Sequence, residues 1–351
     1  MSAYDTARQV VDNAIRQRVF PAATIDVGRS SGSMWSDALG ALTFERDAPA
    51  AAIDTPFDLA SLTKPMATTT VVMELVRTGA LQLDEPVSVF STDWRGADRA
   101  AATIRDLLEH ASGLPARLVD APPDTRREFE HEIGAMPLEY APRSASIYSD
   151  LGFILLGFIV ADRGGMSLAD QFAQITNRVK ADITYGLTPD RRTLAAPTQP
   201  MDEDTRRGRL LAGEVHDNYA AALGGVAGHA GLFATATAVG SFARAWLRAA
   251  RGADDLPPPL TPALVSEFTS RTTVPGSSRA LGWDTMLTTS SCGSRMLRRA
   301  FGHVGFTGSS LWIDPERDRY FVLLTNRACG GGTLEEMRTV RRAFHDALGD
   351  I

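Results

Sequence analysis

Lysine and cysteine are scarce in this chain of 351 residues. Of its 36 lysine and arginine residues, only Lys64 and Lys180 are lysine, so almost every positive charge is carried by arginine. The two cysteines, Cys292 and Cys329, are too few for a disulfide framework, although they could pair with each other if the fold brought them together. This cysteine usage favours a reducing compartment and excludes a disulfide-stabilised scaffold.

Targeting signals, membrane spans and metal motifs are also missing from the sequence. The first ten residues include Asp5 and Arg8 and have no apolar segment of the kind found in secretory signals. The most apolar run, 151–161, is too short to cross a bilayer. The six histidines show no HExxH motif and no paired spacing, so we expect neither a metal nor a cofactor. We therefore expect a cytoplasmic protein with no membrane partner.

The overall charge argues against a nucleic-acid partner. The net charge is −6 and the pI is near 5.6, whereas nucleic-acid binding calls for a strongly basic face. Arginine pairs such as Arg126-Arg127 and Arg206-Arg207 are flanked by acidic residues, a pattern typical of a solvated, charge-compensated surface. These features leave a small molecule as the expected ligand and do not predict the oligomeric state.

The order of expected helices and strands predicts a sheet domain interrupted by a helical insert. A chain of this length exceeds the usual size of one core, so two lobes are expected. We expect helices at 4–18, 103–109, 150–163, 239–250 and 335–348, and strands at 23–27, 34–44, 297–304, 309–314 and 320–326. Residues 1–70 and 270–351 are predicted to form an α/β sheet domain, with a mainly helical domain, 71–269, inserted in the sequence.

One of the two lysines follows a serine by three residues, in Ser61-Leu62-Thr63-Lys64. Positions three apart lie on one face of a helix, which would place the amine over the hydroxyl. Arginine cannot give up its proton in a protein, whereas a desolvated lysine can, so Lys64 could serve as a base beside a nucleophile. Pro65 suits the first turn of a helix that ends at Gly79. The alternative is a solvated amine on a helix surface.

Three short motifs follow one another along the chain: Ser61-Leu62-Thr63-Lys64, Tyr148-Ser149-Asp150 and His303-Val304-Gly305. Together they resemble the SxxK, YxN and KTG (or HxG) motifs of the serine β-lactamase and penicillin-binding protein superfamily. The chain is most similar to the class-C-like branch, which includes family VIII carboxylesterases, and the resemblance covers about residues 6–348. It implies a β-lactamase-like fold, in which an antiparallel sheet is flanked by the N- and C-terminal helices.

The motifs also imply a division of chemical roles. At a helix N-terminus, Ser61 lies where backbone N–H groups favour developing negative charge. Lys64, partly desolvated, is expected to lose its proton more easily than a free lysine and to activate Ser61. Tyr148 can relay that proton to the leaving group, or act as the base when water attacks the acyl-enzyme. The family likeness implies an oxyanion hole made by the N–H groups of Ser61 and Phe306.

Two positions depart from the family pattern. Asp150 stands where Asn is common; it is a candidate substrate-binding residue, or mainly the N-cap of the apolar helix that follows. His303, a second candidate substrate-binding residue together with Gly305, stands where many relatives have Lys. A neutral imidazole attracts a carboxylate less than an ammonium does, so this change favours uncharged ester or amide substrates.

Two other segments imitate functional motifs. The segment Gly28-Arg29-Ser30-Ser31-Gly32 matches the GxSxG pattern of α/β-hydrolases, which requires a strand, a sharp turn and a helix. A second strand is expected after it, so we interpret it as a hairpin turn. His229 lies in a glycine-rich segment that is expected to allow close backbone packing, and we leave it outside the catalytic set.

The predicted function is a serine hydrolase that works through an acyl-enzyme on Ser61, most consistent with a carboxylesterase for short-chain or small esters. The alternatives are a D-amino-acid peptidase or weak β-lactamase, an acyltransferase, and a non-catalytic ligand-binding module. Asp150 is the only feature that favours the non-catalytic alternative. Acyl preference is expected to depend on the loops 117–127 and 189–213, whose shape the sequence does not give.

Overall fold

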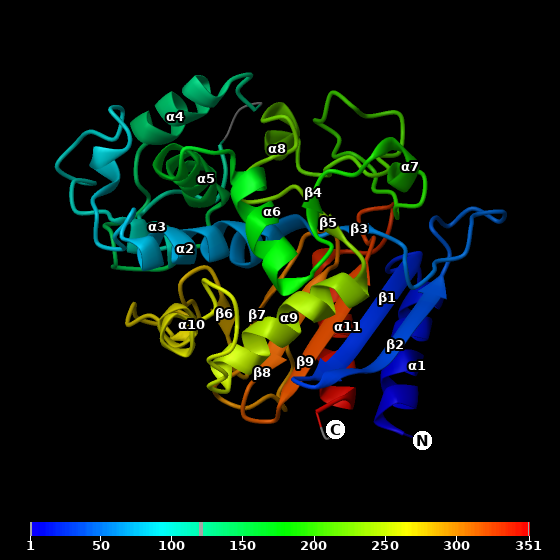
Figure 1. Ribbon diagram of the computed structural model, residues 1–351. Helices are drawn as coiled ribbons and strands as arrows, with labels where there is room; N and C mark the ends of the chain where they lie inside the picture. Colours follow the sequence, from blue (N-terminus) through cyan, green and yellow to red (C-terminus); the bar gives the residue numbers. More distant parts are fainter. Residues whose placement is uncertain (1, 119–121, 350) are drawn as a thin grey trace.

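The computed structural model describes residues 2–118, 122–349 and 351. Its centre is a six-stranded sheet in which every neighbouring pair of strands is antiparallel (Figure 1). The strands, in spatial order, are β2 (Gly32–Gly40), β1 (Ala22–Arg29), β9 (Arg319–Thr325), β8 (Ser310–Asp314), β7 (Phe301–Val304) and β6 (Asp284–Thr285). The first and last parts of the chain therefore build one sheet, and the predicted fold class is confirmed.

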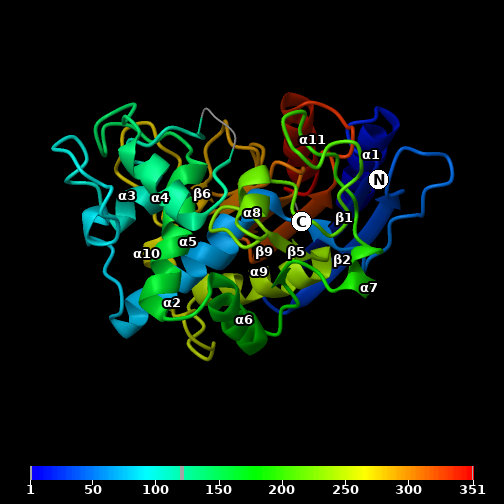
Figure 2. The same ribbon diagram turned by 90° about the horizontal axis from the view of Figure 1, so that it is seen from above.

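Helices cover both faces of this sheet. The N- and C-terminal helices, α1 (Ala3–Arg16) and α11 (Leu334–Ala347), pack together on one face, and α9 (Ala236–Ala250) lies across the other (Figures 1 and 2). Strand β9 is buried along its whole length because its alternate side chains enter two different cores. Phe321 and Leu323 pack with α1 and α11, whereas Tyr320 and Val322 pack with α9.

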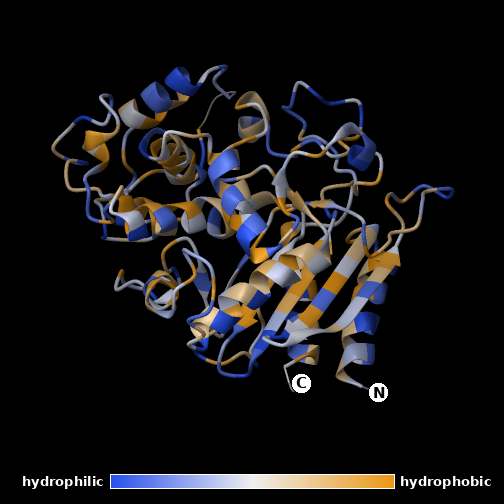
Figure 3. Ribbon diagram, in the orientation of Figure 1, coloured by the Kyte–Doolittle hydropathy of each residue, from blue (hydrophilic) through white to orange (hydrophobic). Residues whose placement is uncertain are grey.

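The remaining helices form a second body beside the sheet. Besides the helical segment that begins near Ser61, they are η3 (Val87–Val89), α3 (Ile104–Leu108), α4 (Arg126–Ala135), α5 (Asp150–Gly164), α6 (Leu168–Val179), α7 (Pro189–Arg192), α8 (Asn218–Ala222) and α10 (Pro262–Thr269). A small sheet joins the two bodies, in the order β3 (Phe57–Asp58), β5 (Leu232–Ala234) and β4 (Thr184–Tyr185). Figure 3 shows the outer helices α4 and α7 as mainly hydrophilic, in keeping with their exposed positions.

Helix α5 forms the centre of the helical body. It is apolar around most of its circumference, and ten of its residues are buried. Gly157 of α5 lies against Gly228, so closely that a side chain on Gly228 would reach within 1.9 Å of a backbone oxygen of α5. The glycine-rich segment therefore allows the close backbone packing that we expected for it.

The helix expected after Ser61 begins with two irregular turns. A tight 3₁₀ turn, η1 (Ala60–Leu62), is followed by a wide π-type turn, η2 (Lys64–Thr69), and only then by the regular helix α2 (Thr70–Thr78). Gly79 ends the helix in the left-handed conformation, with a φ of 75°. The wide turn is wholly buried, and π-type turns are frequent at functional sites.

Some local expectations need correction. The strand expected at 297–304 begins only at Phe301, because Ala300 and the preceding residues form a turn that contacts Asp314. The turn at 28–32 does join two strands of a hairpin, as predicted. Among the described residues, Cys292 and Cys329 are both free and buried, so they do not pair.

The domain boundaries remain a proposal. Helix α9 falls within the segment 71–269 that was assigned to the helical insert, yet it packs on β1 and β9 of the large sheet. A division at residue 269 would therefore place one sheet-covering helix in the helical part.

Within the described residues, no single helix is long and apolar enough to cross a membrane. Only α5 and α6 taken together reach the required length and composition, and these two helices meet at an angle of 78°.

Candidate active site

Ser61 and Lys64 face each other at the start of the irregular helix. Lys64 Nζ lies 3.0 Å from Ser61 Oγ, because the two residues belong to successive turns, η1 and η2. The backbone just before Ser61 is held by Asp58, whose Oδ1 accepts the N–H of Ala60 at 2.7 Å. Ala60 itself has a φ of 48°, an unusual value for a residue with a side chain. The turn therefore presents the serine hydroxyl from a tightly fixed backbone.

Lys64 is completely buried and donates all three of its N–H groups. Its Nζ contacts Ser61 Oγ, Asp150 Oδ1 at 2.7 Å and the His229 carbonyl oxygen at 3.2 Å. Burial lowers the pKa of Lys64, but the Asp150 carboxylate together with Tyr148 outweighs this effect, and the pKa lies above the usual lysine value. The expectation that Lys64 gives up its proton more easily than a free lysine is therefore wrong for the free protein.

Asp150 is not the N-cap of α5. The cap is Ser149, whose Oγ accepts the N–H of Gly152 at 3.4 Å, and Asp150 is the first residue of the helix. Its carboxylate points instead to two cations, with Oδ1 on Lys64 and Oδ2 on Arg117 at 3.1 Å. Asp150 therefore serves as the counter-ion of the buried lysine.

Tyr148 completes the cluster around Lys64. The ammonium nitrogen lies 4.7 Å from the centre of the Tyr148 ring, and the ring packs against His110 at a centroid distance of 4.6 Å. Burial raises the pKa of Tyr148, and the nearby Lys64 and Ser61 offset this only in part. The phenol is therefore protonated at neutral pH.

The third motif lies on β7, opposite Tyr148. The His303 ring is 5.9 Å from the Tyr148 ring, and its Nδ1 lies 2.8 Å from the Val304 carbonyl oxygen, which requires a proton on Nδ1. Burial lowers the pKa of His303 well below its usual value, and the charges of Arg279 and Lys64 add to this effect. His303 is therefore neutral, and its Nε2 is a buried acceptor with no partner among the described residues.

Gly305 and Phe306 connect β7 to the serine turn. A side chain on Gly305 would come within 2.6 Å of the Leu59 carbonyl oxygen, so only glycine allows β7 to lie this close to η1. Phe306 lines the cavity, and its carbonyl oxygen accepts hydrogen bonds from Arg327. The Phe306 ring lies between His216, with centroids 5.3 Å apart, and the Arg327 guanidinium, 4.5 Å from the ring centre.

Three residues of the site were not predicted from sequence. Arg117 donates to Asp150 and, at 3.0 Å, to Asp217, while Asp217 Oδ1 lies 2.8 Å from His229 Nε2. Only the glycine-rich surroundings of His229 gave any signal, and we interpreted them as packing. Arg117 belongs to the loop 117–127, which we expected to form a wall of the pocket; residues 119–121 of that loop lie outside the described residues.

The cluster opens into a cavity of about 510 Å³ between the sheet and the helical body. The residues that line it include Ser61, Tyr148, Asp150, His303, Gly305 and Phe306, so the structure brings all the predicted site residues except the deeper Lys64 to one surface. Met201 and Glu203 from the loop 189–213 form part of its wall. Among the described residues, no three His, Cys, Asp or Glu side chains gather as they would around a metal ion.

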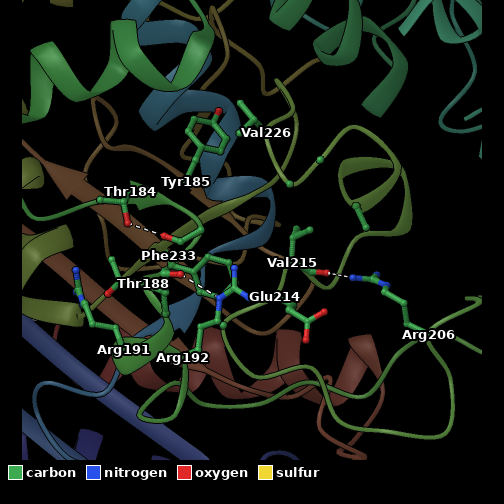
Figure 4. A pocket seen from close by; sticks show the side chains of 16 residues that line it. Thr184, Tyr185, Thr188, Arg191, Arg192, Arg206, Glu214, Val215, Val226 and Phe233 are labelled. Carbon is green, nitrogen blue, oxygen red and sulfur yellow. Dashed lines mark hydrogen bonds between the residues drawn. The ribbon is translucent and has the colours of Figure 1, made fainter. Parts of the chain in front are cut away.

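A larger cavity, of about 710 Å³, lies on the other side of the segment 213–217 (Figure 4). Tyr185, Arg191, Arg192, Val215 and Phe233 are among the residues that line it. Four residues of the loop 189–213 line this second cavity (Arg191, Arg192, Arg206 and Gly213), whereas two line the cavity at Ser61, so only part of the expectation for that loop is met.

Known proteins are similar to this chain in sequence and in architecture. A family model described as Beta-lactamase matches residues 7–345. A protein of Salmonella agona (strain SL483), described as "Putative D-alanyl-D-alanine carboxypeptidase", is 30% identical over 317 residues, which cover 79% of this chain and 70% of that protein.

Two solved structures share the fold over nearly the whole chain. A class C β-lactamase from Rhodobacter sphaeroides has a TM-score of 0.77 at 19% identity, and the match covers 98% of each chain. EstCE1, described as a hydrolase with promiscuous acyltransferase activity, has a TM-score of 0.76 at 20% identity and the same coverage. At these identities the likeness supports the fold alone, and the sequence matches carry the family. The chain therefore belongs to the Beta-lactamase family and is a serine hydrolase.

Proposed function

We propose that the protein is a carboxylesterase that hydrolyses short-chain or small esters through an acyl-enzyme on Ser61. The observation that carries the proposal is the contact between Ser61 Oγ and a buried lysine, in a cavity where the third motif supplies a neutral His303. A cation at that position would favour anionic substrates, whereas an uncharged acceptor suits an uncharged ester.

Acylation begins with the transfer of the Ser61 proton as its oxygen attacks the ester carbonyl. Lys64 is 3.0 Å away and can accept that proton only in its neutral form. Because the pKa of Lys64 is raised, this form becomes populated only as the pH rises, and activity is expected to increase towards alkaline pH.

Departure of the alcohol needs a proton donor and a place for the negative charge. Tyr148, protonated and beside both Ser61 and Lys64, is suited to donate to the leaving oxygen. The N–H of Phe306, which no acceptor among the described residues engages, and the N–H of Ser61 are the expected oxyanion donors. Loss of one such donor typically costs about 10²–10³ in rate.

A serine substitution with a matched control tests the proposal. Ser61→Ala should abolish hydrolysis of p-nitrophenyl esters and covalent labelling by a fluorophosphonate. The control is Ser30→Ala, which removes the serine of the GxSxG-like hairpin turn and should leave both properties unchanged. Full activity of the Ser61 variant, or labelling that is lost only with Ser30, would overturn the assignment.

A carboxypeptidase acting on D-amino-acid peptides is the second candidate, favoured by the identity to the Salmonella proteins that carry that description. Turnover of a short ester, a D-alanyl-D-alanine peptide and nitrocefin at equal enzyme concentration orders the possibilities. The ester should have the largest kcat/KM; a peptide that is turned over faster would replace the carboxylesterase with the carboxypeptidase.

A further inference from the structure

Lys64 and four other residues form a closed ring of polar contacts. Lys64 Nζ donates to Asp150 Oδ1 at 2.7 Å, and Asp150 Oδ2 accepts from Arg117 Nη1 at 3.1 Å. The same Nη1 donates to Asp217 Oδ2 at 3.0 Å, and Asp217 Oδ1 lies 2.8 Å from His229 Nε2. The His229 carbonyl oxygen closes the ring by accepting from Lys64 Nζ at 3.2 Å. Every link is therefore a direct contact between neighbours.

Arg117 lies in a loop, yet its guanidinium is firmly held. Its Nη2 donates to Asn218 Oδ1 at 2.8 Å, and its guanidinium lies 4.2 Å from the centre of the Tyr219 ring. Asp217 in turn caps α8 by accepting the N–H of Ala220 at 2.8 Å. The guanidinium is therefore fixed from the α8 side while it reaches Asp150 on α5.

The charges of the ring are balanced in a specific way. Asp150 divides its two oxygens between Lys64 and Arg117, so neither cation has the whole carboxylate. The pKa of Arg117, lowered by burial, is raised more strongly by Asp217 and Asp150, so this cation does not titrate. A fixed positive charge beside Asp150 weakens the hold of that carboxylate on the ammonium group of Lys64.

We propose that Arg117 is a positioning residue: by holding one oxygen of Asp150, it limits how tightly that carboxylate binds the ammonium group of Lys64. Without Arg117, Asp150 would face Lys64 alone, and the lysine would keep its proton to higher pH. The inference rests on the proposed role of Lys64 as the base in ester hydrolysis, and it adds a residue from a different loop to the control of that base.

Other ionisable groups face the ring from the elements packed against it. They are Tyr148 before α5, His110 after α3, Tyr219 on α8, His303 on β7, Arg279 before β6, and Asp58 and His216 beside Asp217. Burial raises the pKa of Asp58 to about 6 and lowers that of His216 to about 4. Asp58 and His216 therefore titrate at acidic pH. The rise in kcat/KM at alkaline pH, called the alkaline limb below, is assigned to Lys64.

The test is the pH profile of kcat/KM for phenyl acetate, a neutral ester, between about pH 6 and about pH 12, a range that extends past the usual lysine pKa of about 10.4 and so reaches the upper part of the Lys64 titration. Arg117→Gln should move the alkaline limb upwards by about one pH unit, which lowers kcat/KM near neutrality about tenfold and spares the plateau at high pH. Asp150→Asn, which removes the negative charge beside Lys64, should move the limb downwards. Arg117→Lys keeps the charge and should lie close to the unmodified protein.

If Arg117 has this role, the alkaline limb should move upwards in Arg117→Gln and downwards in Asp150→Asn. A purely structural defect in Arg117→Gln would lower kcat/KM by the same factor at every pH, and that result would overturn the proposal, as would a downward shift of its limb. If Arg117→Gln does not fold, Asn218→Ala removes one anchor of the guanidinium and should give a smaller upward shift, with an unmoved limb counting against the proposal. The rate of fluorophosphonate labelling against pH provides a second readout that is independent of the leaving group.

The outcomes also separate this inference from the proposed function. An active Ser61→Ala variant would remove the serine mechanism itself, whatever the pH profiles show. Ester hydrolysis that depends on Ser61, with limbs unmoved in the Arg117 and Asp150 variants, would overturn only the role of Arg117.

Discussion

The cavity at Ser61 and the cavity beyond the segment 213–217 differ more in chemistry than in size. The cavity beyond the segment 213–217 is the larger, at about 710 Å³ against about 510 Å³ (Figure 4). Its charged residues are mostly neutralised by neighbours: Arg191 pairs with Asp182, Arg206 with Asp204, and Glu214 with Arg209. Its volume is therefore bounded by side chains whose charges are already satisfied.

The smaller cavity instead contains a nucleophile and a polar group without a partner. It combines the Ser61 hydroxyl with a buried His303 Nε2 that no described residue engages, and the buried Lys64 lies directly behind the serine. Burial raises the pKa of Tyr148 in this cavity and that of Tyr185 in the larger one, so a raised tyrosine pKa does not separate the two. Perturbed and unpartnered groups are unfavourable for folding and cluster at functional sites. The comparison shows that unsatisfied chemistry, rather than volume, distinguishes the candidate active site.

Replacing one tyrosine in each cavity tests this difference with the largest expected effect on activity. Tyr148→Phe should lower kcat for ester hydrolysis by about 10²–10⁴, because the proton donor to the leaving group is lost. The matched variant Tyr185→Phe removes a hydroxyl that donates to the Ala227 carbonyl oxygen at 3.1 Å in the larger cavity. It should keep kcat while costing about 1 kcal/mol of stability. Steady-state kinetics and thermal unfolding check both; equal losses of kcat would erase the distinction.

Adding a positive charge to each cavity in turn should have a smaller effect, on the preference for charged over neutral substrates. His303→Lys places a cation where the structure has a neutral imidazole, and it should raise the turnover of nitrocefin, which bears a carboxylate, relative to a neutral ester by about tenfold. Thr188→Lys adds the same charge to the larger cavity and should leave that ratio unchanged. The ratio of the two kcat/KM values is the measurement, and a ratio that His303→Lys does not alter would show that this position does not select substrate charge.

The smallest effect is expected from Arg192, which lines only the larger cavity and donates Nε to the Leu187 carbonyl oxygen at 3.0 Å. Arg192→Gln should change kcat/KM by less than about twofold, as is usual for surface substitutions away from a site. A larger loss would mean that the two cavities communicate through their shared wall, since Val215 lines one and His216 the other.

Most of the fold follows from patterns that short windows of sequence contain. The continuous apolar run of β9 and the helical periodicity of α1 and α11 are local, and their positions were predicted to within a few residues. The start of β7 was not, because 297–300 forms a turn in which the Leu297 N–H donates to Asp314, a residue that is distant in sequence. The π-type turn at Lys64 depends on tertiary packing and has no local signature.

The residues of the candidate site also fall into those that local sequence patterns predict and those that they do not. The spacing and order of the three motifs predicted Ser61, Tyr148 and His303 as site residues, and in the structure all three line one cavity. The links of Arg117 to Asp150 and Asp217 join residues 33 and 100 positions apart, and no local pattern announces such pairs. The direction of the Lys64 shift was wrong for this reason: burial could be anticipated from the sequence, whereas the carboxylate that outweighs it could not.

Phe306 has a consequence for how this family member can change over time. Its backbone is fixed by the two hydrogen bonds from Arg327 to its carbonyl oxygen, while the residue remains 41% exposed at the rim of the cavity. The oxyanion role proposed for Phe306 belongs to its peptide N–H, so it would not depend on which side chain that residue bears. Mutation at this codon can therefore reshape the entrance for new acyl groups while the machinery beneath is inherited intact.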